Sequence, residues 1–329
     1  MNMPNFGSHS DFGKLHEVIV GIPDDLTLPP FSKDLNHYND ELRDALEETG
    51  NRPLSIKEAF PERWERTKEQ MEGIAKTYED NGITVHRVRP YTEEETKYLD
   101  TLQEGHSLLS PADPVFVIGN HFLEVNIRRA YRRKEVFPIR DLVMPMIEAD
   151  PDAHHVAMPA AQPWTPSGEG PGPFLEGGDI MISGNELIVG MGSLCSNQAG
   201  INWLKRYIEP YGYNVHPMPI KGDILHGLGI MCLLREGLLM THTPALADGL
   251  PEPLKNWDVI EITEQEMNGH ATVGVSLDDS RYMINPQHNR VMDELYKHGI
   301  EPISTTCEDI GYWGGAIRCI TLPLKRDAA

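Results

Sequence analysis

The sequence predicts a mixed α/β protein that repeats one unit five times, with a β-hairpin, an α-helix and a closing strand in each unit. Two observations predict it. Short apolar runs recur in pairs joined by turn residues, and amphipathic stretches with helical spacing separate these pairs from further apolar runs. No single unit can bury both faces of its sheet and its helix, so we expect one shared core and a single domain over residues 1–329. An ordinary α/β sandwich with the same elements explains the pattern equally well.

The first two units are read from apolar runs on either side of a charged helical stretch. Glycine and asparagine accept the positive φ that a short hairpin turn needs, and Gly119-Asn120 stands at such a turn. The expected elements, in order, are the strand Val18–Gly21, a helix over Lys57–Glu79, the strand Ile83–Val88, the hairpin strands Val115–Ile118 and Phe122–Val125, a helix over Glu135–Ala149 and the strand His155–Met158.

The last three units have the same shape. Ile201, Leu204 and Ile208 repeat at helical spacing after a hairpin that turns at Gly184-Asn185. The expected elements of the third unit are Asp179–Ile182, Glu186–Val189, a helix over Asn197–Tyr207 and Asn214–Pro217. The fourth has Ile230–Leu234, Leu238–Thr241 and Val259–Ile262, and the fifth has Thr272–Leu277, Tyr282–Ile284, a helix over Gln287–His298 and Ile303–Thr305.

The charge balance narrows the class of partner. The chain has 29 lysine and arginine residues against 50 aspartate and glutamate residues, which gives a formal net charge of −21. A field of this sign repels phosphate backbones and anionic lipid, so we expect neither a nucleic-acid nor a membrane partner. The same field weakly favours a cationic small molecule as the ligand.

The termini and the cysteines indicate the compartment. Met1–Phe12 lacks the basic and apolar regions of a secretory signal, and the longest apolar run, Gly227–Leu234, is too short to cross a bilayer. The four cysteines form neither a disulfide framework nor a CxxC metal motif. We therefore expect a protein of the reducing cytoplasm. The cysteines are Cys195, Cys232, Cys307 and Cys319.

Two carboxylate segments precede apolar strands, and two long loops stand beside them. Glu176-Gly177-Gly178-Asp179 is a routine polar entry to a hairpin, but its glycines also let the backbone approach a ligand that the carboxylates face. Asp113 precedes a proline at the mouth of another strand, where such a pair commonly forms a turn. The loops His106–Pro114 and Ala160–Pro173 do not fit the repeat, and long loops in a compact domain are more often functional than not.

A histidine and a cysteine complete the set of candidate residues. His226 enters an apolar strand, where one of 14 histidines is ordinarily structural. Cys319 follows the glycine-rich run Gly311–Arg318 and begins the last strand. A cysteine in a strand is usually a small buried hydrophobe, whereas one after a flexible loop and near basic groups can hold a thiolate. Each signal is weak alone, and the four segments together are much stronger.

The order Asp, Glu-Gly-Gly-Asp, His and Gly-Gly…Cys resembles the guanidine-modifying superfamily, and most closely its amidinotransferases. The resemblance covers nearly the whole chain and implies the pentein fold, a five-bladed, pseudo-symmetric α/β propeller of ββαβ modules. This fold agrees with the five units read above. The segments that carry the resemblance are Phe12–Gly21, Pro111–Arg133, Ser193–Arg206 and the glycine-rich run into Cys319-Ile320-Thr321.

The resemblance also implies a role for each candidate residue. Cys319 falls on the covalent nucleophile, His226 on the general acid/base, and Glu176 on the carboxylate that partners the histidine. Asp113 and Asp179 fall among the substrate-binding positions, with Asp113 holding the guanidinium and Asp179 supporting the loop. No metal or organic cofactor is required. The expected partners are a small guanidino donor and an amine acceptor, and relatives often form dimers.

The implied chemistry suits these residue types. Carboxylates bind and orient a planar guanidinium through its N–H edges. A thiolate then attacks the central carbon, the histidine protonates the departing amine, and an amidino group remains on sulfur. The same histidine next deprotonates an incoming amine, which gives transfer, or a water, which gives hydrolysis.

Two positions depart from the pattern and keep a second function open. Leu228 stands at a substrate-binding position where the superfamily usually has an aspartate, and the arginine that binds the substrate carboxylate falls near Ala245. Losing one charged hydrogen bond of about 1.5–3 kcal/mol weakens guanidinium binding by roughly 10- to 100-fold. The sequence thus predicts an amidinotransferase. The alternative is a hydrolase, deiminase-like or dimethylarginine dimethylaminohydrolase-like, acting on arginine or an Nω-substituted guanidine. A protein that only binds guanidines is disfavoured, because binding needs no nucleophile.

Overall fold

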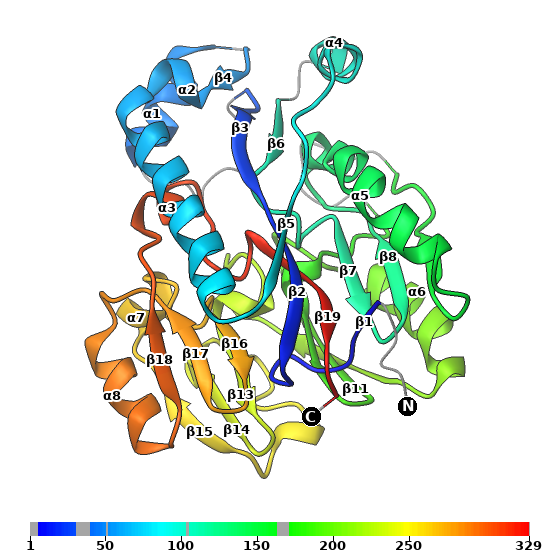
Figure 1. The fold of residues 1–329 in the computed structure, drawn as a ribbon, viewed down its shortest axis with the longest axis vertical. Coiled ribbons are helices and arrows are strands. Elements are labelled where there is room, and N and C mark those ends of the chain that lie inside the picture. Colours follow the sequence, from blue (N-terminus) through cyan, green and yellow to red (C-terminus); the bar gives the residue numbers. More distant parts are fainter. Residues whose placement is uncertain (1–5, 31–39, 51, 103–104, 163–170, 329) are drawn as a thin grey trace.

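The computed structural model describes residues 6–30, 40–50, 52–102, 105–162 and 171–328, and these residues form six small sheets (Figure 1). Five sheets belong to the repeated units. Their strands are β2 (Leu15–Val20), β5 (Thr84–Arg87) and β19 (Thr321–Arg326); β7 (Val115–Ile118), β8 (His121–Glu124) and β9 (His154–Ala157); β10 (Ile180–Ser183), β11 (Glu186–Met191) and β12 (Asn214–Pro219); β13 (Met231–Arg235), β14 (Leu238–Thr241) and β15 (Asp258–Glu261); and β16 (Val275–Asp278), β17 (Arg281–Ile284) and β18 (Glu301–Ser304). Residues 163–170 of the predicted loop Ala160–Pro173 lie outside the described ranges.

All five units share one topology. In each, the first two strands pair antiparallel and the third pairs parallel with the second, as β7, β8 and β9 do. A parallel pair needs a crossover connection, and the helix of the unit supplies it in four of the five cases. The crossover helices are α3 (Pro61–Asp80), α5 (Val136–Glu148), α6 (Gln198–Ile208) and α8 (Asn289–Lys297). The structure confirms the five repeated hairpin-and-strand units, whereas their arrangement as propeller blades stays a prediction.

The first unit is completed from the other end of the chain. The sequence showed only one strand before its helix, and the structure supplies the second as β19, which pairs antiparallel with β2. β1 (Gly7–Ser8) adds to the outer side of β19 in parallel. Figure 1 shows β19, in red, beside β2, in blue. The two ends of the chain are thereby held in one sheet.

The fourth unit lacks an α-helix in its crossover, which corrects the prediction of a helix in every unit. Its connection contains only two short 3₁₀ turns, at Thr243–Ala245 and Glu252–Leu254. Pro244, Pro251 and Pro253 interrupt this segment, and proline removes a backbone donor and clashes with the preceding turn of a helix. The short α7 (Glu264–Asn268) follows only after β15 and begins with a capping box at Thr263.

A sixth sheet was not predicted, and neither were the short α7 and the helices α1 (Asp40–Glu48), α4 (Glu93–Leu102) and α9 (Glu308–Tyr312). The strands β3 (Ile22–Leu28), β4 (Leu54–Ser55) and β6 (His106–Leu108) pair in the order β4-β3-β6. They lie at the top of Figure 1, near α1 and α4 and above β2. This layer stands next to the segment that leads to Cys319. The predicted helix Lys57–Glu79 is divided at Phe60 into α2 (Ile56–Ala59) and α3.

The cores lie between each helix and its sheet. On α6, Ile201, Leu204 and Ile208 are fully buried, as their helical spacing predicts.

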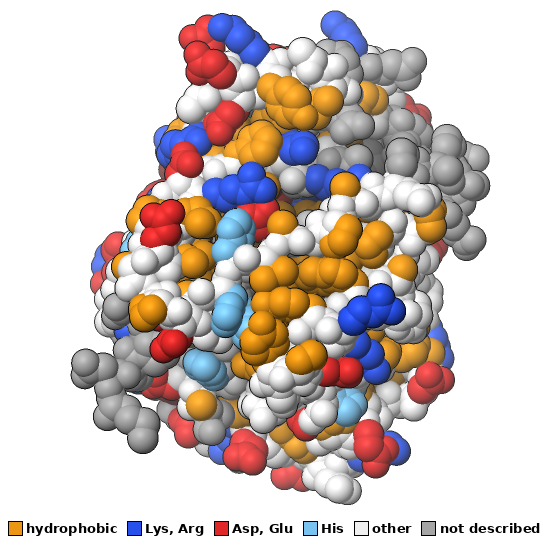
Figure 2. All heavy atoms as spheres, turned by 90° about the vertical axis from the view of Figure 1, so that its right-hand side faces the viewer, with side chains coloured by type: hydrophobic (Ala, Val, Ile, Leu, Met, Phe, Trp, Pro, Cys, Tyr) orange, Lys and Arg blue, Asp and Glu red, His pale blue; other side chains and the backbone are white. Residues whose placement is uncertain are grey.

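No described helix is long and apolar enough to cross a membrane. On the face shown in Figure 2, acidic and basic side chains are interspersed around a band of hydrophobic and histidine side chains.

Candidate active site

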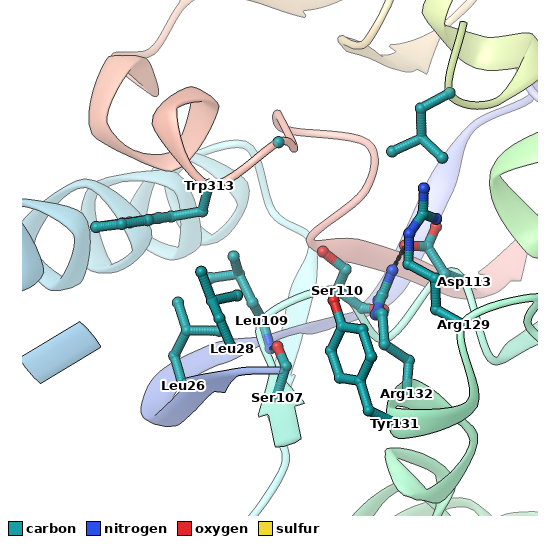
Figure 3. Close-up of a pocket in the computed structure, with 12 residues that line it drawn as sticks. Leu26, Leu28, Ser107, Leu109, Ser110, Asp113, Arg129, Tyr131, Arg132 and Trp313 are labelled. Atoms are coloured by element: carbon teal, nitrogen blue, oxygen red, sulfur yellow. Dashed lines mark hydrogen bonds and ion pairs between the residues drawn. The ribbon is translucent and has the colours of Figure 1, made fainter. Parts of the chain in front are cut away.

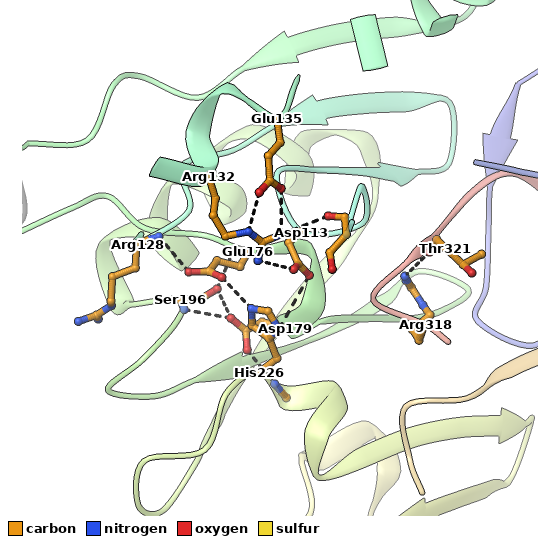
Figure 4. Close-up of polar contacts among 12 residues, drawn as sticks. Asp113, Arg128, Arg132, Glu135, Glu176, Asp179, Ser196, His226, Arg318 and Thr321 are labelled. Carbon is orange, nitrogen blue, oxygen red and sulfur yellow. Dashed lines mark hydrogen bonds and ion pairs between the residues drawn. The ribbon is translucent and has the colours of Figure 1, made fainter. Parts of the chain in front are cut away.

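Four candidate residues occupy the same place in four different units. Asp113 comes just before β7, Glu176 before η3 (Gly177–Asp179) and β10, and His226 before η5 (Gly227–Gly229) and β13. Cys319 comes just before β19. Because the units share one topology, equivalent strand ends meet, and Figure 4 shows the polar side chains of three of these residues converging on one point. The structure thus brings together residues that are up to 206 positions apart, from 113 to 319.

Glu176 and His226 form a buried pair. His226 Nε2 lies 2.7 Å from Glu176 Oε2, and the backbone N–H of Arg128 donates to Glu176 Oε1 at 2.9 Å. Burial raises the pKa of Glu176, but the hydrogen bond and charge of His226, the charge of Arg129 and the Arg128 N–H together outweigh it and hold that pKa at about 2. Glu176 is therefore a carboxylate throughout the neutral range and keeps Nε2 of His226 as a hydrogen-bond donor.

His226 is held as a cation. Burial lowers its pKa, but Asp113, the hydrogen bond with Cys319 and the pair with Glu176 together raise that pKa well above the ordinary value. Its other ring nitrogen, Nδ1, lies 3.9 Å from Asp113 Oδ1. The imidazole is only 3% exposed, so its charge is compensated by these partners and not by solvent.

The backbone at His226 is strained, and Asp179 supports it. His226 has φ of 66°, a left-handed conformation that few residues other than glycine adopt. The next backbone N–H, of Gly227, donates to Asp179 Oδ1 at 2.8 Å, and Ser196 donates through both N–H and Oγ to Asp179 Oδ2. Both oxygens of Asp179 are thereby occupied by the protein. Asp179 supports the loop, as the resemblance implied, and does not face the pocket described below.

The two glycines of the Glu-Gly-Gly-Asp segment make room for the protein itself, which corrects the interpretation that they admit a ligand. A Cβ at Gly177 would lie 1.9 Å from the carbonyl oxygen of Ala112, and a Cβ at Gly178 would lie 2.4 Å from His226 Nδ1. Gly177 also donates its N–H to the Asp113 carbonyl at 2.9 Å. The diglycine therefore packs the Glu176 segment against both the Asp113 segment and the imidazole.

Asp113 has one oxygen that accepts a hydrogen bond and one that makes only an ion pair, 3.9 Å from His226 Nδ1. Arg132 Nη1 donates to Asp113 Oδ2 at 2.7 Å, while the same guanidinium binds Glu135 through Nε and Nη2 at 2.8 and 2.9 Å. Asp113 Oδ1 is buried and has no hydrogen-bond partner among the described residues. A buried carboxylate oxygen without a donor is costly, and it is available to an incoming N–H group.

Cys319 lies at the end of a loop that is anchored to α3. Arg63, Arg66 and Gln70 on α3 all donate to Asp309 at the start of α9, at 3.0, 3.1 and 2.9 Å respectively. Trp313 donates its indole N–H to Thr67 on the same helix at 2.8 Å. Of the four cysteines, three are buried and only Cys319 is partly exposed. A nucleophile needs this combination of a fixed backbone and an accessible sulfur.

A small pocket with a cavity volume of about 40 Å³ opens beside Asp113 (Figure 3). It is lined by Leu26, Leu28, Ser107, Leu109, Ser110, Asp113, Arg129, Tyr131, Arg132, Leu225, Trp313 and Gly314. Gly315 lies between the pocket and the nucleophile. A Cβ at this position would lie 3.8 Å from Ser110 Oγ and 3.5 Å from Cys319 Cβ.

Leu228 is not among the residues that line this pocket. It is 4% exposed and packs in an apolar cluster with Ile230 and Met231. Ala245 is buried in the same cluster. Neither position therefore faces the described pocket.

Several residues of the site were not predicted from the sequence. Arg129, Arg132 and Ser110 line the pocket, and Glu135 fixes Arg132. The signal available in the sequence was the basic run Arg128-Arg129…Arg132-Arg133 directly after the hairpin that follows Asp113. The sequence could not say which of these arginines is paired, because their partners come from other segments.

No family model matches the chain. It is 23% identical to a putative inosamine-phosphate amidinotransferase of Streptomyces griseus, over 98% of this chain and 97% of the relative. It is 21% identical to the L-arginine:L-lysine amidinotransferase of Pseudomonas savastanoi pv. phaseolicola, over 97% and 94%. An amidinotransferase of the saxitoxin biosynthetic pathway from Microseira wollei superimposes with a TM-score of 0.80 at 21% identity, over 99% of this chain and 98% of that chain.

These comparisons confirm both the resemblance to amidinotransferases and the fold class predicted from the sequence. The likeness runs over almost the full length of the chain and of each of these proteins. The chain therefore has the α/β fold of the guanidine-modifying enzymes.

Proposed function

We propose that this relative of the amidinotransferases moves an amidino group from arginine or a related guanidino donor to a small amine, through an intermediate on Cys319. The observation that carries the proposal is the buried Asp113 Oδ1, which makes no hydrogen bond with the described residues and lies 3.9 Å from the imidazole of His226. An oxygen in this state can accept a hydrogen bond from a guanidinium and hold it against the cysteine.

The donor binds first, with its guanidinium against Asp113. Arg132 fixes the other oxygen of Asp113, and Glu135 fixes Arg132, so the free Oδ1 has a defined direction. Binding to a preorganised acceptor costs little reorganisation. The negative net charge of −21 also attracts a cationic donor toward the protein.

The first chemical step forms a bond between Cys319 Sγ and the central carbon of the guanidinium. The bond from this carbon to the nitrogen of the leaving amine breaks, and the proton of the His226 imidazolium passes to that nitrogen. The amidino group stays on sulfur, and His226 becomes neutral. Glu176 orients His226 through Nε2 and compensates the positive charge before the proton leaves.

The second step reverses the roles. The neutral imidazole takes a proton from the incoming amine, whose nitrogen attacks the amidino carbon. The carbon–sulfur bond breaks, the thiolate of Cys319 is regenerated, and His226 returns to its charged form. Atoms and charges balance over the two steps without an oxidant or a reductant.

Mass spectrometry of products from the purified protein tests this proposal. Arginine is supplied with and without a panel of small amines, and transfer yields ornithine plus a new guanidino compound only when an acceptor is present. The intact mass of the protein after brief exposure to arginine alone should increase by the mass of the amidino adduct. Cys319→Ala should lower turnover by about 10⁴-fold or more and should abolish the adduct.

Two results would contradict the proposal. Full turnover by Cys319→Ala would exclude the covalent mechanism. Citrulline formation at an undiminished rate without any amine would instead assign the protein to the hydrolases. Cys307→Ala is the matched control, since Cys307 is buried and belongs to the apolar cluster below the loop, and it should retain the adduct on Cys319.

A further inference from the structure

Arg129 is a cation in the pocket whose buried donors make no hydrogen bond with the described residues, although its charge interacts with that of Glu176. It lines the same pocket as Asp113 (Figure 3). Its Nε and Nη1 atoms are buried and have no hydrogen-bond partner among the described residues. Burying an unpaired guanidinium costs free energy, and a fold keeps such a group where a ligand supplies the missing partner.

The neighbouring arginines differ from Arg129 in this respect. Arg132 is bound to two carboxylates, Arg133 donates to two backbone carbonyls, and Arg128 donates to a third. These three side chains therefore hold the segment together. Arg129 stands in the same basic run but contributes no such contact with its buried donors.

The charges of the pocket define two ends. Asp113 keeps one oxygen without a hydrogen bond from the described residues, so this end accepts an N–H donor, while Arg129, whose buried donors make no hydrogen bond with them either, attracts an anion. The charge of Arg132 is compensated by Asp113 and Glu135, which leaves Arg129 as the cation available to a ligand among the described lining residues. A substrate that carries both charges would bind in one orientation only.

We propose that Arg129 binds the oxyanion, a carboxylate or a phosphate, of a substrate whose guanidino or amino end lies at Asp113. The inference deepens the proposed function and rests on it, because it names the second charged group that the substrate must carry. The resemblance places the arginine that binds the substrate carboxylate near Ala245. Ala245 is buried in an apolar cluster and carries no charge, so Arg129 would supply the missing cation. The carboxylate site of this chain is then built on the segment after β8.

Matched substrate pairs test the inference. Arginine is compared with agmatine as donor, and glycine with methylamine and phosphoethanolamine with ethanolamine as acceptors. For the wild type, kcat/KM should favour the anionic member of at least one pair, and Arg129→Met should reduce that preference by about 10- to 100-fold. Turnover of the member that lacks the carboxylate or phosphate should stay within a few-fold of the wild-type value, whereas a purely structural role of Arg129 would lower both members alike.

Arg129→Lys and Arg140→Met are the controls. Lysine keeps the charge but loses the planar fork, so it should restore part of the preference for the anionic member. Arg140 on α5 pairs with Glu124 on β8, outside the pocket. Its replacement removes one positive charge from the same unit as Arg129. Arg140→Met should leave every substrate ratio unchanged.

A binding measurement separates this inference from the proposed function. Calorimetric titration of Cys319→Ala with arginine, agmatine, phosphoethanolamine and inorganic phosphate needs no turnover. Weaker binding of an anionic probe to Cys319→Ala/Arg129→Met, with agmatine unchanged, supports the anion site even if no amidino transfer is found. Equal affinities of both proteins for every anionic probe would overturn the inference, whatever the reaction proves to be.

Discussion

At the scale of single residues, the candidate site combines one satisfied charge network with two unsatisfied buried groups. Glu176, His226 and Asp179 have partners for nearly all of their polar atoms, and they fix the imidazole. Asp113 Oδ1 and the buried donors of Arg129 make no hydrogen bond with the described residues. Fixed groups orient a substrate and unpartnered groups bind it, so this contrast separates the supporting residues from the binding residues.

Glu176→Gln tests the buried pair through the pH dependence of activity. The carboxylate is one of the groups that raise the pKa of His226, so its removal lowers that pKa. Since the charged imidazole is the proton donor of the first step, activity is lost as pH rises through the pKa of His226. The alkaline limb of kcat/KM should therefore move to lower pH, with kcat reduced by about 10²-fold or more.

The control for this prediction is Glu186→Gln. Glu186 pairs with His216 between the neighbouring strands β11 and β12, where both side chains are partly exposed. Its replacement should leave the pH–rate profile unchanged. An alkaline limb that stays in place in Glu176→Gln would show that the limb does not report His226.

At the scale of elements, the diglycine before β10 and the helix α3 decide where the reactive side chains stand. Gly177 and Gly178 let three segments approach one another more closely than any Cβ would allow. Helix α3 holds the start of α9 through Asp309 and Trp313, and α9 leads into Cys319. The diglycine and the residues of α3 that bind Asp309 and Trp313 thus position the site without taking part in its chemistry.

Replacing the two glycines separately should give different defects. Gly178→Ala places its Cβ against the His226 ring, so the imidazole must move and kcat should fall by about 10²-fold or more. Gly177→Ala meets the backbone carbonyl of Ala112, which yields less readily, so we expect a loss of about 3 kcal/mol in unfolding free energy. Urea denaturation and steady-state kinetics measure both effects.

Gly73→Ala is the matched control, because a Cβ at Gly73 on α3 meets no atom within 4 Å. Alanine is favoured over glycine inside a helix by about 1 kcal/mol, so this variant should be neutral or slightly stabilised. Unchanged kcat in Gly178→Ala would contradict the role given to this glycine.

Asp309→Ala tests the anchoring of the cysteine loop. Asp309 is 8% exposed and accepts hydrogen bonds from Arg63, Arg66 and Gln70. Its removal leaves these donors without an acceptor and should cost about 1–3 kcal/mol of stability. We also expect kcat to fall more than KM rises, because Cys319 is displaced while the pocket around Asp113 is kept.

Thermal unfolding and kinetics of Asp309→Ala are compared with Asp80→Ala. Asp80 pairs with Lys76 on the same helix, but both are well exposed, so its loss should cost no more than about 0.5 kcal/mol. An Asp309→Ala protein with normal kcat would show that α3 does not position the nucleophile.

At the scale of the whole molecule, the site exists because like units meet at like positions. Asp113, Glu176, His226 and Cys319 each precede the first strand of a hairpin in a different unit. The strand pair that follows Cys319 is formed by β19 and β2, from opposite ends of the chain. Closing this sheet therefore fixes the position of Cys319 relative to the rest of the site.

Truncation of the last strand tests this closure. Deleting residues 321–329 removes β19 and exposes the partners of Leu322 and Leu324, which are 1% and 0% exposed. Because two buried leucines and a strand pairing are lost, we expect a loss of more than about 5 kcal/mol and no cooperative thermal transition. Deleting only residues 328–329 leaves β19 intact and should keep the wild-type transition; a folded 321–329 deletion would contradict the prediction.

The sequence was a good guide to the repeats and to the order of the reactive residues. Short apolar runs joined by turn residues predicted the strands, and helical spacing at Ile201, Leu204 and Ile208 predicted the helix α6, within a few residues. It failed where an element takes its partner from far along the chain, as β19 does, or where prolines stop a helix, as in the fourth unit. The sheet β4-β3-β6 was missed because β4 and β6 have only two and three residues and the register of β3 with β6 is irregular.

What the sequence determined by itself is the inventory: five units, a cysteine after a glycine-rich loop, and a histidine and carboxylates at strand entries. Residue types and local periodicity are properties of short segments, so they can be read without a fold. Only the tertiary structure decided which charges are paired, because pairing joins segments such as Asp113 and Arg132 or Glu176 and His226. It gave Asp179 the hydrogen bonds by which it supports the loop, placed Leu228 in an apolar cluster and left the buried donors of Arg129 without a hydrogen bond from the described residues.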